Sequence, residues 1–482
     1  MLSPATVALD RGNISDTLMV LLLLLAADAT VTAVISGRAR SLVLAAIFAG
    51  LAFQAKMVEA WLVLPALALA YLLAGSGRWS RRLVRVSCAG VVVAGVSLSW
   101  MVAVTLWPAG GRPYVDGSSG NSIFAQVFVY NGLGRLDQPS PNQLLTKAIG
   151  LRLGSASAGW SRLLSGADGR DTGWLIPASL VSLAACLVIS RRRRNERLFA
   201  GSVLWGVWLV VLLVTFSASA TINVYYTAAL SPAIAALLGT GLALAWAHRT
   251  ELTARLAVAA TVALSCGYAA WLVPRSGVGP VTGLKEAAAV LGLAAVAALL
   301  LPVGHRGRAG PFVLGALAIM AVPAVASVSL AAEGFGPFDT PFEPATSSSY
   351  VRALGGLPKQ VAALLPRLEQ ANEGVPDLMA TQTSAVAAPF IYDSGKEVLP
   401  IGGFTGTIPE PTLDALRAMI SAGDLHTVVQ SAKVSDPRLV WVAHTCLTIS
   451  PGTGPETAAG GLRFAVYYCG RLPTLPGRGS HR

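Results

Sequence analysis

The feature that most constrains this chain is a series of ten apolar segments, separated by short loops in which arginines are concentrated. A helix that crosses the hydrocarbon core of a bilayer needs ~20 apolar residues, and most of the segments reach that length. The segments are 17–35, 41–55, 57–74, 86–107, 173–190, 198–216, 224–247, 254–273, 283–302 and 311–332. This pattern predicts an all-α polytopic membrane bundle of about ten transmembrane helices.

Composition and charge agree with a membrane lipid environment. Only 12% of the 482 residues are charged, whereas soluble domains carry about 25%. The net charge of +12 could suggest a nucleic-acid partner. However, the basic residues lie in short runs between apolar segments, and no basic stretch is interleaved with aromatic residues. We therefore expect no nucleic acid among the partners of this chain.

The arginine-rich loops predict the topology. Loops 36–40, 75–85, 191–197, 247–255 and 303–310 together hold fifteen arginines and no lysine, which is typical of cytoplasmic loops. Segment 41–74 could be one long helix or a hairpin, but arginines at both of its ends require an even number of crossings. We therefore predict a hairpin with Lys56 at its outer tip. The same parity places the N-terminus, the long loop 108–172 and the tail from about residue 333 outside the cytoplasm of a plasma-membrane protein.

The tail has a different composition and predicts a small extracytoplasmic α/β domain. We divide the chain into a transmembrane domain (1–332), a linker rich in Gly, Pro and Ser (333–349), an α/β domain (350–472) and a disordered end (473–482). Helices are expected at 351–371 and 411–422. Strands are expected at 378–383, 398–402, 427–430, 439–444 and 463–468.

Two cysteines in the tail predict a disulfide. Cys446 and Cys469 each follow an expected strand, and the two strands could pair as neighbours. An extracytoplasmic, oxidising compartment favours a disulfide between them. The alternative is a pair of separately buried thiols. His444 and Cys446 lack a second pair of ligands, so we expect no zinc site in the tail.

Polar residues near membrane depth are candidates for function, and here they gather at the outer ends of the helices. Each also has a structural interpretation: Asp16 could cap its helix, Lys56 could extend toward the interface, and the tyrosines could be interfacial aromatics. Asn131 and Arg135 could be ordinary loop residues. The candidates are Asp10, Arg11, Asn13, Asp16, Lys56, Glu59, Asn131, Arg135, Tyr225 and Tyr226.

Four segments together resemble the polytopic glycosyltransferases of family 39, and more closely the bacterial aminoarabinose transferases and protein O-mannosyltransferases. They are ALDRGNISDTLMVLLLLLAADA (8–29), GLAFQAKMVEAWLVLPALALAYLL (50–73), RPYVDGSSGNSIFAQVFVYNGLGRL (112–136) and VYYTAALSPAIAALLG (224–239). The tail, with ATQTSAVAAPFIY (380–392) and VLPIGGFTGT (398–407), is similar to the extracytoplasmic domain of actinobacterial members.

The resemblance implies a GT-C fold and transfer of a sugar from a polyprenyl-phosphate carrier to a cell-envelope acceptor at the outer face of the membrane. It implies an acidic catalytic residue, for which Asp16 and Asp10 are the candidates. It implies that Lys56, Arg135 and Arg11 bind the donor phosphate. Asn13, Glu59, Asn131, Tyr225 and Tyr226 would line the cavity. Some relatives carry a metal-binding His where Asn131 stands, so a divalent metal ion as cofactor is left open, and no metal ligand is assigned.

The resemblance also leaves alternatives open. The family's catalytic aspartate lies after the first helix, and this sequence resembles the family from about its fourth helix onward. We therefore expect this chain by itself to lack the general base and to be an incomplete, inactive form or a scaffold. A transporter is the remaining alternative, but the sequence shows no internal repeat and almost no charge inside the helices.

Overall fold

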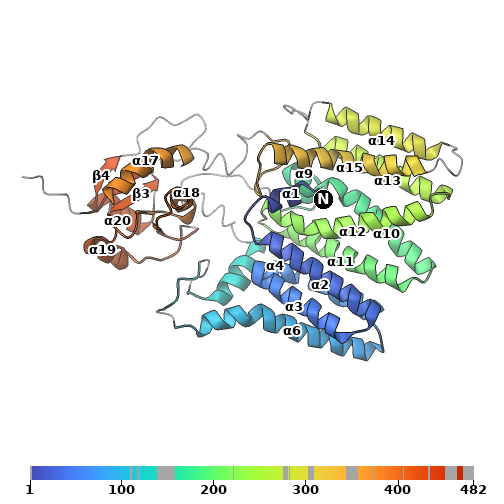
Figure 1. Ribbon diagram of the computed structural model, residues 1–482, viewed down its shortest axis with the longest axis horizontal. Helices are drawn as coiled ribbons and strands as arrows, with labels where there is room; N and C mark the ends of the chain where they lie inside the picture. The colour runs from blue at the N-terminus through green and yellow to red at the C-terminus, as the bar shows by residue number, and fades with distance from the viewer. Residues whose placement is uncertain are drawn as a thin grey trace, which may run out of the picture. The chain divides into compact units, whose positions relative to one another are not determined.

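The computed structural model comprises a helical unit and a smaller unit that contains a β-sheet (Figure 1). The helical unit is formed by residues 1–112, 127–138 and 156–348, and the sheet unit by residues 113–126, 139–155 and 349–482. The structure describes residues 3–108, 111–116, 118, 120–137, 158–220, 222–274, 281, 283–301, 309–343, 357–372, 374–404, 406–431, 435–450 and 464–470.

All ten predicted apolar segments are helical. Their helices are α2 (Asp16–Ser36), α3 (Ala39–Lys56), α4 (Val58–Trp61), α5 (Leu64–Ala74), α6 (Trp79–Leu106), α10 (Ile176–Arg192), α11 (Glu196–Ala218), α12 (Ser231–Ala247), α13 (Leu252–Leu272), α14 (Leu284–Leu300) and α15 (Ala309–Ala332). Eight helical spans within the described residues are long and apolar enough to cross a membrane, and Val58–Ala74 is apolar but shorter. The prediction of a polytopic helical membrane bundle is confirmed.

Many large apolar side chains on the surface of the bundle are exposed. Val91 on α6 is 73% exposed and Leu293 on α14 is 71% exposed. A soluble protein would bury such a continuous apolar surface, whereas lipid accepts it without cost. The close contacts inside the bundle rely on small residues instead. At Gly50 of α3, an added Cβ would lie 2.6 Å from Val96 of α6, so these two helices pack almost backbone to backbone.

The helices alternate in direction, which gives the bundle two distinct ends (Figure 1). We call one of them the Lys56 end. It is where α3 ends and where α2 and α12 begin. The short connections 75–78 and 193–195, which together with the adjoining helix ends hold many arginines, lie at the opposite end, which we call the arginine end. Shorter helical elements occur outside the main helices. They are α1 (Pro4–Asp10), η2 (Ala125–Leu133), α7 (Gly134–Asp137), η3 (Arg162–Leu164), α9 (Gly166–Thr172), η4 (Gly173–Leu175) and η5 (Val224–Leu230).

The second unit contains a five-stranded sheet in the order β2-β1-β3-β5-β4. Its strands are β1 (Met379–Thr381), β2 (Val398–Pro400), β3 (Thr427–Ser431), β4 (Leu447–Ser450) and β5 (Phe464–Tyr468), and its helices are α17 (Leu357–Ala371), α18 (Ser384–Ser394), α19 (Leu413–Ala422) and α20 (Pro437–Thr445). β1 is parallel to β2 and β3, whereas β5 is antiparallel to both β3 and β4.

Helices cover both faces of the sheet. On one face, Phe390 of α18 and Leu368 of α17 pack against Val429 of β3. On the other face, Leu416 of α19 and Val442 of α20 pack against Val428. Successive residues of β3 therefore contribute to two different hydrophobic cores, as expected for a strand that is buried on both sides. The predicted small α/β domain is confirmed.

One expected strand of this domain is wrong. Residues 439–444 lie in helix α20, and the following strand β4 was not predicted. Asp436 caps α20 by accepting a hydrogen bond from the Arg438 N–H at 2.8 Å, and Pro437 occupies the first turn. These are strong helix-start signals, and they outweigh the β-branched run that suggested a strand. The expected helix start at residue 351 and the end 473–482 lie outside the described residues.

The cysteines Cys446 and Cys469 are joined by a disulfide, with their Cα atoms 4.6 Å apart. Each cysteine was expected to follow a strand, but only Cys469 does. Cys446 lies between α20 and β4, while Cys469 follows β5, and β4 and β5 are antiparallel partners. The bond therefore closes the end of the β4–β5 ladder near Leu447 and Tyr468.

Candidate active site

The centre of the candidate site is an ion pair between the start of α2 and the end of α3. These helices form an antiparallel hairpin of similar lengths, so the first residue of one lies beside the last residue of the other. Lys56 Nζ lies 2.6 Å from Asp16 Oδ2. Asp16 is only 1% exposed. Its side chain makes no capping hydrogen bond; Ser15 is at the cap position and Asp16 is directed at Lys56 instead.

The backbone immediately after Lys56 is strained. Met57 has a φ of 57° and a ψ of −139°, an unfavourable conformation for a residue with a side chain, and it separates α3 from α4. Phe53, Trp61 and Phe128 pack around this break, with ring centroids 4.6 to 6.2 Å apart. Strain held in place by such packing is a common property of functional sites.

Two tyrosines form the aromatic side of the site. Lys56 Nζ lies 4.9 Å from the ring centroids of both Tyr225 and Tyr226, close enough for cation–π attraction. Tyr225 is buried, and its hydroxyl accepts a hydrogen bond from Asn223 Nδ2 at 3.0 Å. The Lys56 ammonium is therefore directed at Asp16 and the two rings, and Tyr225 packs inside the bundle while Tyr226 is half-buried.

Glu59 and Arg135 complete the charged group. The carboxyl of Glu59 is close enough to Asp16, Lys56 and Arg135 to interact electrostatically with each. Arg135 donates from Nη2 to Asn131 Oδ1 at 2.7 Å, and its guanidinium lies 5.3 Å from the centroid of the Tyr130 ring. Two acids and two cations from three separate segments are thus collected at the Lys56 end.

Four polar atoms of this group are buried without a hydrogen-bond partner among the described residues; one is the ion-paired Asp16 Oδ2, and the other three are Asp16 Oδ1, Glu59 Oε1 and Arg135 Nη1. Buried polar groups are nearly always hydrogen-bonded, and an unmade bond costs about 1–3 kcal/mol. Two free acceptors and one free cationic donor therefore match a ligand that carries both hydroxyl groups and an anionic group.

Three predicted site residues do not join this group. Asp10 ends α1 and is exposed, and Asn13 is exposed in the connection to α2. Arg11 donates to the Phe335 backbone carbonyl at 3.3 Å. Nothing in the described structure joins any of the three to the Asp16–Lys56 pair. α1 instead packs inside the Lys56 end, where its Thr6 hydroxyl donates to Ser231 Oγ at 2.8 Å.

The residues at the site do not fit a divalent metal ion. Among the described residues, no group of three or more His, Cys, Asp and Glu side chains is placed to hold a metal. Asn131, which stands where some relatives of the resembled family carry a histidine, uses its carbonyl oxygen to accept from Arg135. A guanidinium bound to that oxygen would repel a cation, so we derive no step through a metal.

The structure also reveals a second charged cluster, which sequence reasoning missed. Arg162 Nε lies 3.1 Å from Asp168 Oδ2, and Arg170 Nη2 lies 2.5 Å from Glu343 Oε1. Asp171 is fully buried and accepts from the Thr340 hydroxyl at 3.2 Å. The sequence signal was the run Asp168-Gly-Arg-Asp before an apolar helix, but its partners are too distant in sequence to be identified from spacing.

This second cluster holds chain segments together. Arg162 Nη1 donates to the Ser219 carbonyl at 2.7 Å, which satisfies an acceptor at the end of α11. The Arg170–Glu343 and Asp171–Thr340 contacts attach residues 335–343 to α9. We therefore assign this cluster a structural role beside the candidate site.

Comparisons with known proteins agree with this architecture. Residues 1–107 match the family model "Dolichyl-phosphate-mannose-protein mannosyltransferase", and residues 364–444 match "Putative mannosyltransferase YkcB-like, C-terminal". The chain is 27% identical to "Putative mannosyltransferase YkcB" of Bacillus subtilis (strain 168), over 87% of this chain and 71% of that protein.

A second relative gives the same result. "Putative mannosyltransferase YycA" of Bacillus subtilis (strain 168) is 26% identical, over 88% of this chain and 73% of that protein. No solved structure gives a significant match. The Asp16–Lys56 pair and Glu59 lie inside the first matched region. Over most of its length the chain is therefore similar to putative mannosyltransferases, and its first 107 residues match the dolichyl-phosphate-mannose-protein mannosyltransferase model, which supports a membrane glycosyltransferase.

Proposed function

We propose that this protein transfers a sugar from a polyprenyl-phosphate carrier to a hydroxyl group of a cell-envelope acceptor, and that the reaction takes place at the Lys56 end of the bundle. The observation that carries the proposal is the group formed by Asp16, Lys56, Glu59 and Arg135, with its unsatisfied buried acceptors and donor. The names of the relatives make mannose the first sugar to test.

The cations suit the donor phosphate. When the sugar leaves its carrier, the bond between the anomeric carbon and the phosphate oxygen breaks, and the electron pair stays on that oxygen. The phosphate then gains negative charge. Lys56 and the free Nη1 of Arg135 would stabilise this charge in a site shielded from water, where fixed donors are most effective. The Tyr225 and Tyr226 rings would keep Lys56 in position.

The acids suit the acceptor. Its oxygen attacks the anomeric carbon as the carrier phosphate departs, and its proton must pass to a base. Asp16 Oδ2 is already engaged with Lys56, whereas Glu59 Oε1 has no partner in the described structure. We therefore propose Glu59 as the proton acceptor and Asp16 as the residue that positions Lys56, in place of the expectation from the sequence that this chain lacks its general base and is inactive. Asp10, the other acid expected from the sequence, is exposed and makes no contact with the group.

The proposal is tested by the transfer of labelled mannose in liposomes that contain the purified protein. We expect transfer from polyprenyl-phosphate mannose and none from a nucleotide-linked mannose. Lys56→Met should reduce transfer at least 100-fold, the typical effect of losing one charge-stabilising donor.

A matched control is Lys285→Met, because Lys285 also lies at a helix terminus of the Lys56 end, in the first turn of α14. This variant should retain wild-type transfer. Equal activity of the Lys56→Met variant and the control, or transfer only from the nucleotide-linked donor, would refute the proposal.

A further inference from the structure

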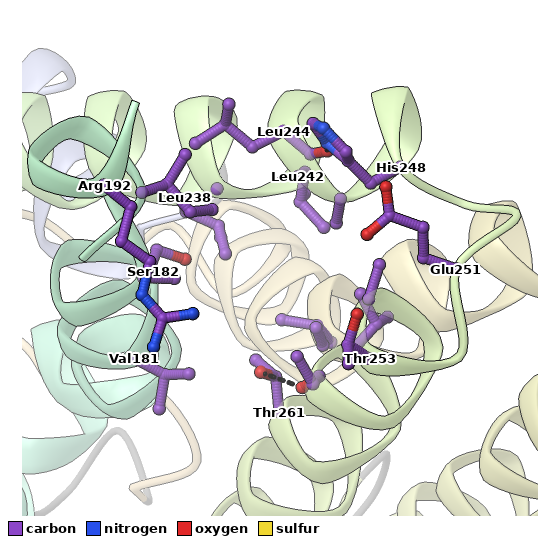
Figure 2. A pocket seen from close by; sticks show the side chains of 18 of the residues that line it. Val181, Ser182, Arg192, Leu238, Leu242, Leu244, His248, Glu251, Thr253 and Thr261 are labelled. Carbon is purple, nitrogen blue, oxygen red and sulfur yellow. Dashed lines mark hydrogen bonds between the residues drawn. The ribbon is translucent and has the colours of Figure 1, made fainter. Parts of the chain in front are cut away.

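A cavity of about 370 Å³ lies at the arginine end (Figure 2). None of the residues that line it belongs to the candidate active site. The walls of the cavity are formed by α10, α12 and α13, with Ile319 contributed by α15. α10 and α12 touch at Gly241, where an added Cβ would lie 2.4 Å from Ser182 Oγ. Leu238, Val258 and Ile319 are among the apolar side chains that line it. This volume falls within the about 300–1,000 Å³ typical of sites for small organic ligands.

The charged residues of the cavity and His248 are gathered near the loops. Arg192 and Arg193 contribute from the end of α10, and His248 and Glu251 from the connection between α12 and α13. Figure 2 shows Arg192 on one side of the cavity and His248 with Glu251 on the other. Both arginines are exposed, and neither forms a side-chain ion pair or hydrogen bond within the described structure. Arg191, Arg194 and Arg197 add further positive charge to the same loop.

An apolar cavity with a cationic mouth at one end of a transmembrane bundle matches an amphiphile with an anionic headgroup. We propose that this cavity binds one anionic glycerophospholipid, with its headgroup phosphate at Arg192 and Arg193 and an acyl chain between α10 and α13. Basic pockets between transmembrane helices recognise anionic lipid headgroups by the same charge complementarity. The single acid, Glu251, could accept a hydrogen bond from a headgroup hydroxyl.

The occupant is a phospholipid rather than the polyprenyl phosphate of the proposed reaction. The cavity has room for one short acyl segment, whereas a polyprenyl chain is much longer and branched. The cavity is also at the opposite end from Lys56 and Glu59, so a phosphate bound here cannot reach the proposed reacting group. The inference therefore does not depend on the proposed function.

The test uses the full-length protein, purified in detergent and delipidated. Native mass spectrometry measures the binding of added dioleoyl phosphatidylglycerol, with dioleoyl phosphatidylcholine for comparison. We expect one phosphatidylglycerol molecule to bind at least 10-fold more tightly than phosphatidylcholine. Replacement of both arginines (Arg192→Ala with Arg193→Ala) should weaken phosphatidylglycerol binding by roughly 30-fold.

Two further variants separate the cavity from general surface charge. Arg194→Ala with Arg197→Ala removes the same charge from the same loop but outside the cavity, and should change binding less than threefold. Ala257→Phe fills the cavity while keeping every charge, and should abolish the tight binding. If Arg192→Ala with Arg193→Ala fails to fold, the Ala257→Phe result decides the test.

Three results would overturn the inference. They are equal binding of the two phospholipids, equal losses in the two double-arginine variants, and tight binding that persists in Ala257→Phe. Competition by polyprenyl phosphate at this cavity, with loss of the bound phospholipid, would also overturn the assignment of the occupant.

Discussion

Replacing Lys56 by methionine should destabilise the bundle more than any other single change at the site. The Asp16 side chain is 2% exposed and its Oδ2 lies 2.6 Å from Lys56 Nζ, so removing the lysine leaves a buried carboxylate without its counter-ion. Breaking a buried pair by removal of one partner costs about 3–5 kcal/mol. Methionine keeps most of the apolar volume of the lysine stem, so the loss reports on charge rather than on packing.

Replacing Asp16 by asparagine should cost less. Lys56 would keep the faces of Tyr225 and Tyr226, a contribution of about 0.5–2 kcal/mol, and the nearby Glu59 carboxyl. We therefore expect a loss of about 1–3 kcal/mol. The double variant (Asp16→Asn with Lys56→Met) removes both charges together. It should be more stable than Lys56→Met alone, which requires a coupling energy larger than the Asp16→Asn loss, about 3 kcal/mol between the two positions.

The assay is unfolding of the purified protein in mixed micelles by increasing denaturing detergent, followed by circular dichroism. The predicted order of stability is wild type, Asp16→Asn, the double variant and then Lys56→Met, and transfer should be lost in both variants that lack the lysine. Lys285→Met is the control and should unfold like the wild type. Additive single losses, with a coupling energy below about 0.5 kcal/mol, would show that the ion pair does not hold this site together.

Three further predictions concern other residues. Glu59→Gln should reduce sugar transfer about 10²–10⁴-fold with little change in donor affinity, because it removes a proton acceptor but no phosphate ligand; initial rates against donor concentration check this. Replacing Cys446 and Cys469 by serine should destabilise the tail domain by about 3 kcal/mol, as measured by denaturant-dependent hydrogen exchange, because the bond closes a loop of 23 residues. Burial opposes ionisation of Asp436, but the hydrogen bonds from Arg438 more than offset it and lower the Asp436 pKa below 3.8. The resulting stabilisation of the folded tail is present above about pH 4 and is lost as the pH falls through the folded-state pKa. Urea titrations of hydrogen exchange in the tail, at several pH values, measure this loss.

Each of these predictions has a control or a refuting result. Glu286→Gln changes an acid in the first turn of α14 and should leave transfer unchanged. Serine variants that match the wild-type exchange rates would show that the tail does not depend on its disulfide. The stability difference between the wild type and an Asp436→Asn variant should be smaller at pH 3 than at pH 7. An equal difference at both pH values would contradict the assigned sign.

The bundle could be predicted from the sequence because hydropathy and loop charge report directly on the lipid environment. A helix such as α2 needs no knowledge of its neighbours to be recognised: it is an apolar stretch that begins at Asp16 and ends at Ser36, followed by Gly37 in the left-handed conformation typical of helix C-termini. The hairpin at Lys56 was also predictable, because arginines on both sides of residues 41–74 require it. Residues 439–444 form helix α20 rather than the expected strand because Asp436 and Pro437 start a helix there.

The geometry of the site was harder to predict than its residues. Loop charge indicates the side of the membrane on which a residue lies, but it gives no distances within that side. Asp10 and Asp16 therefore looked equivalent, although α1 leaves Asp10 exposed and only Asp16 reaches Lys56. The Arg170–Glu343 pair joins residues 173 positions apart, and only tertiary packing brings them together.

The most direct test of the central claim is an experimental structure of this protein with polyprenyl phosphate bound. We predict that the phosphate oxygens lie within hydrogen-bond distance, about 3 Å, of both Lys56 Nζ and Arg135 Nη1, with Glu59 facing the space for the acceptor. A phosphate bound elsewhere, with Lys56 still paired only to Asp16 and Arg135 Nη1 still without a partner, would contradict the assignment of the active site.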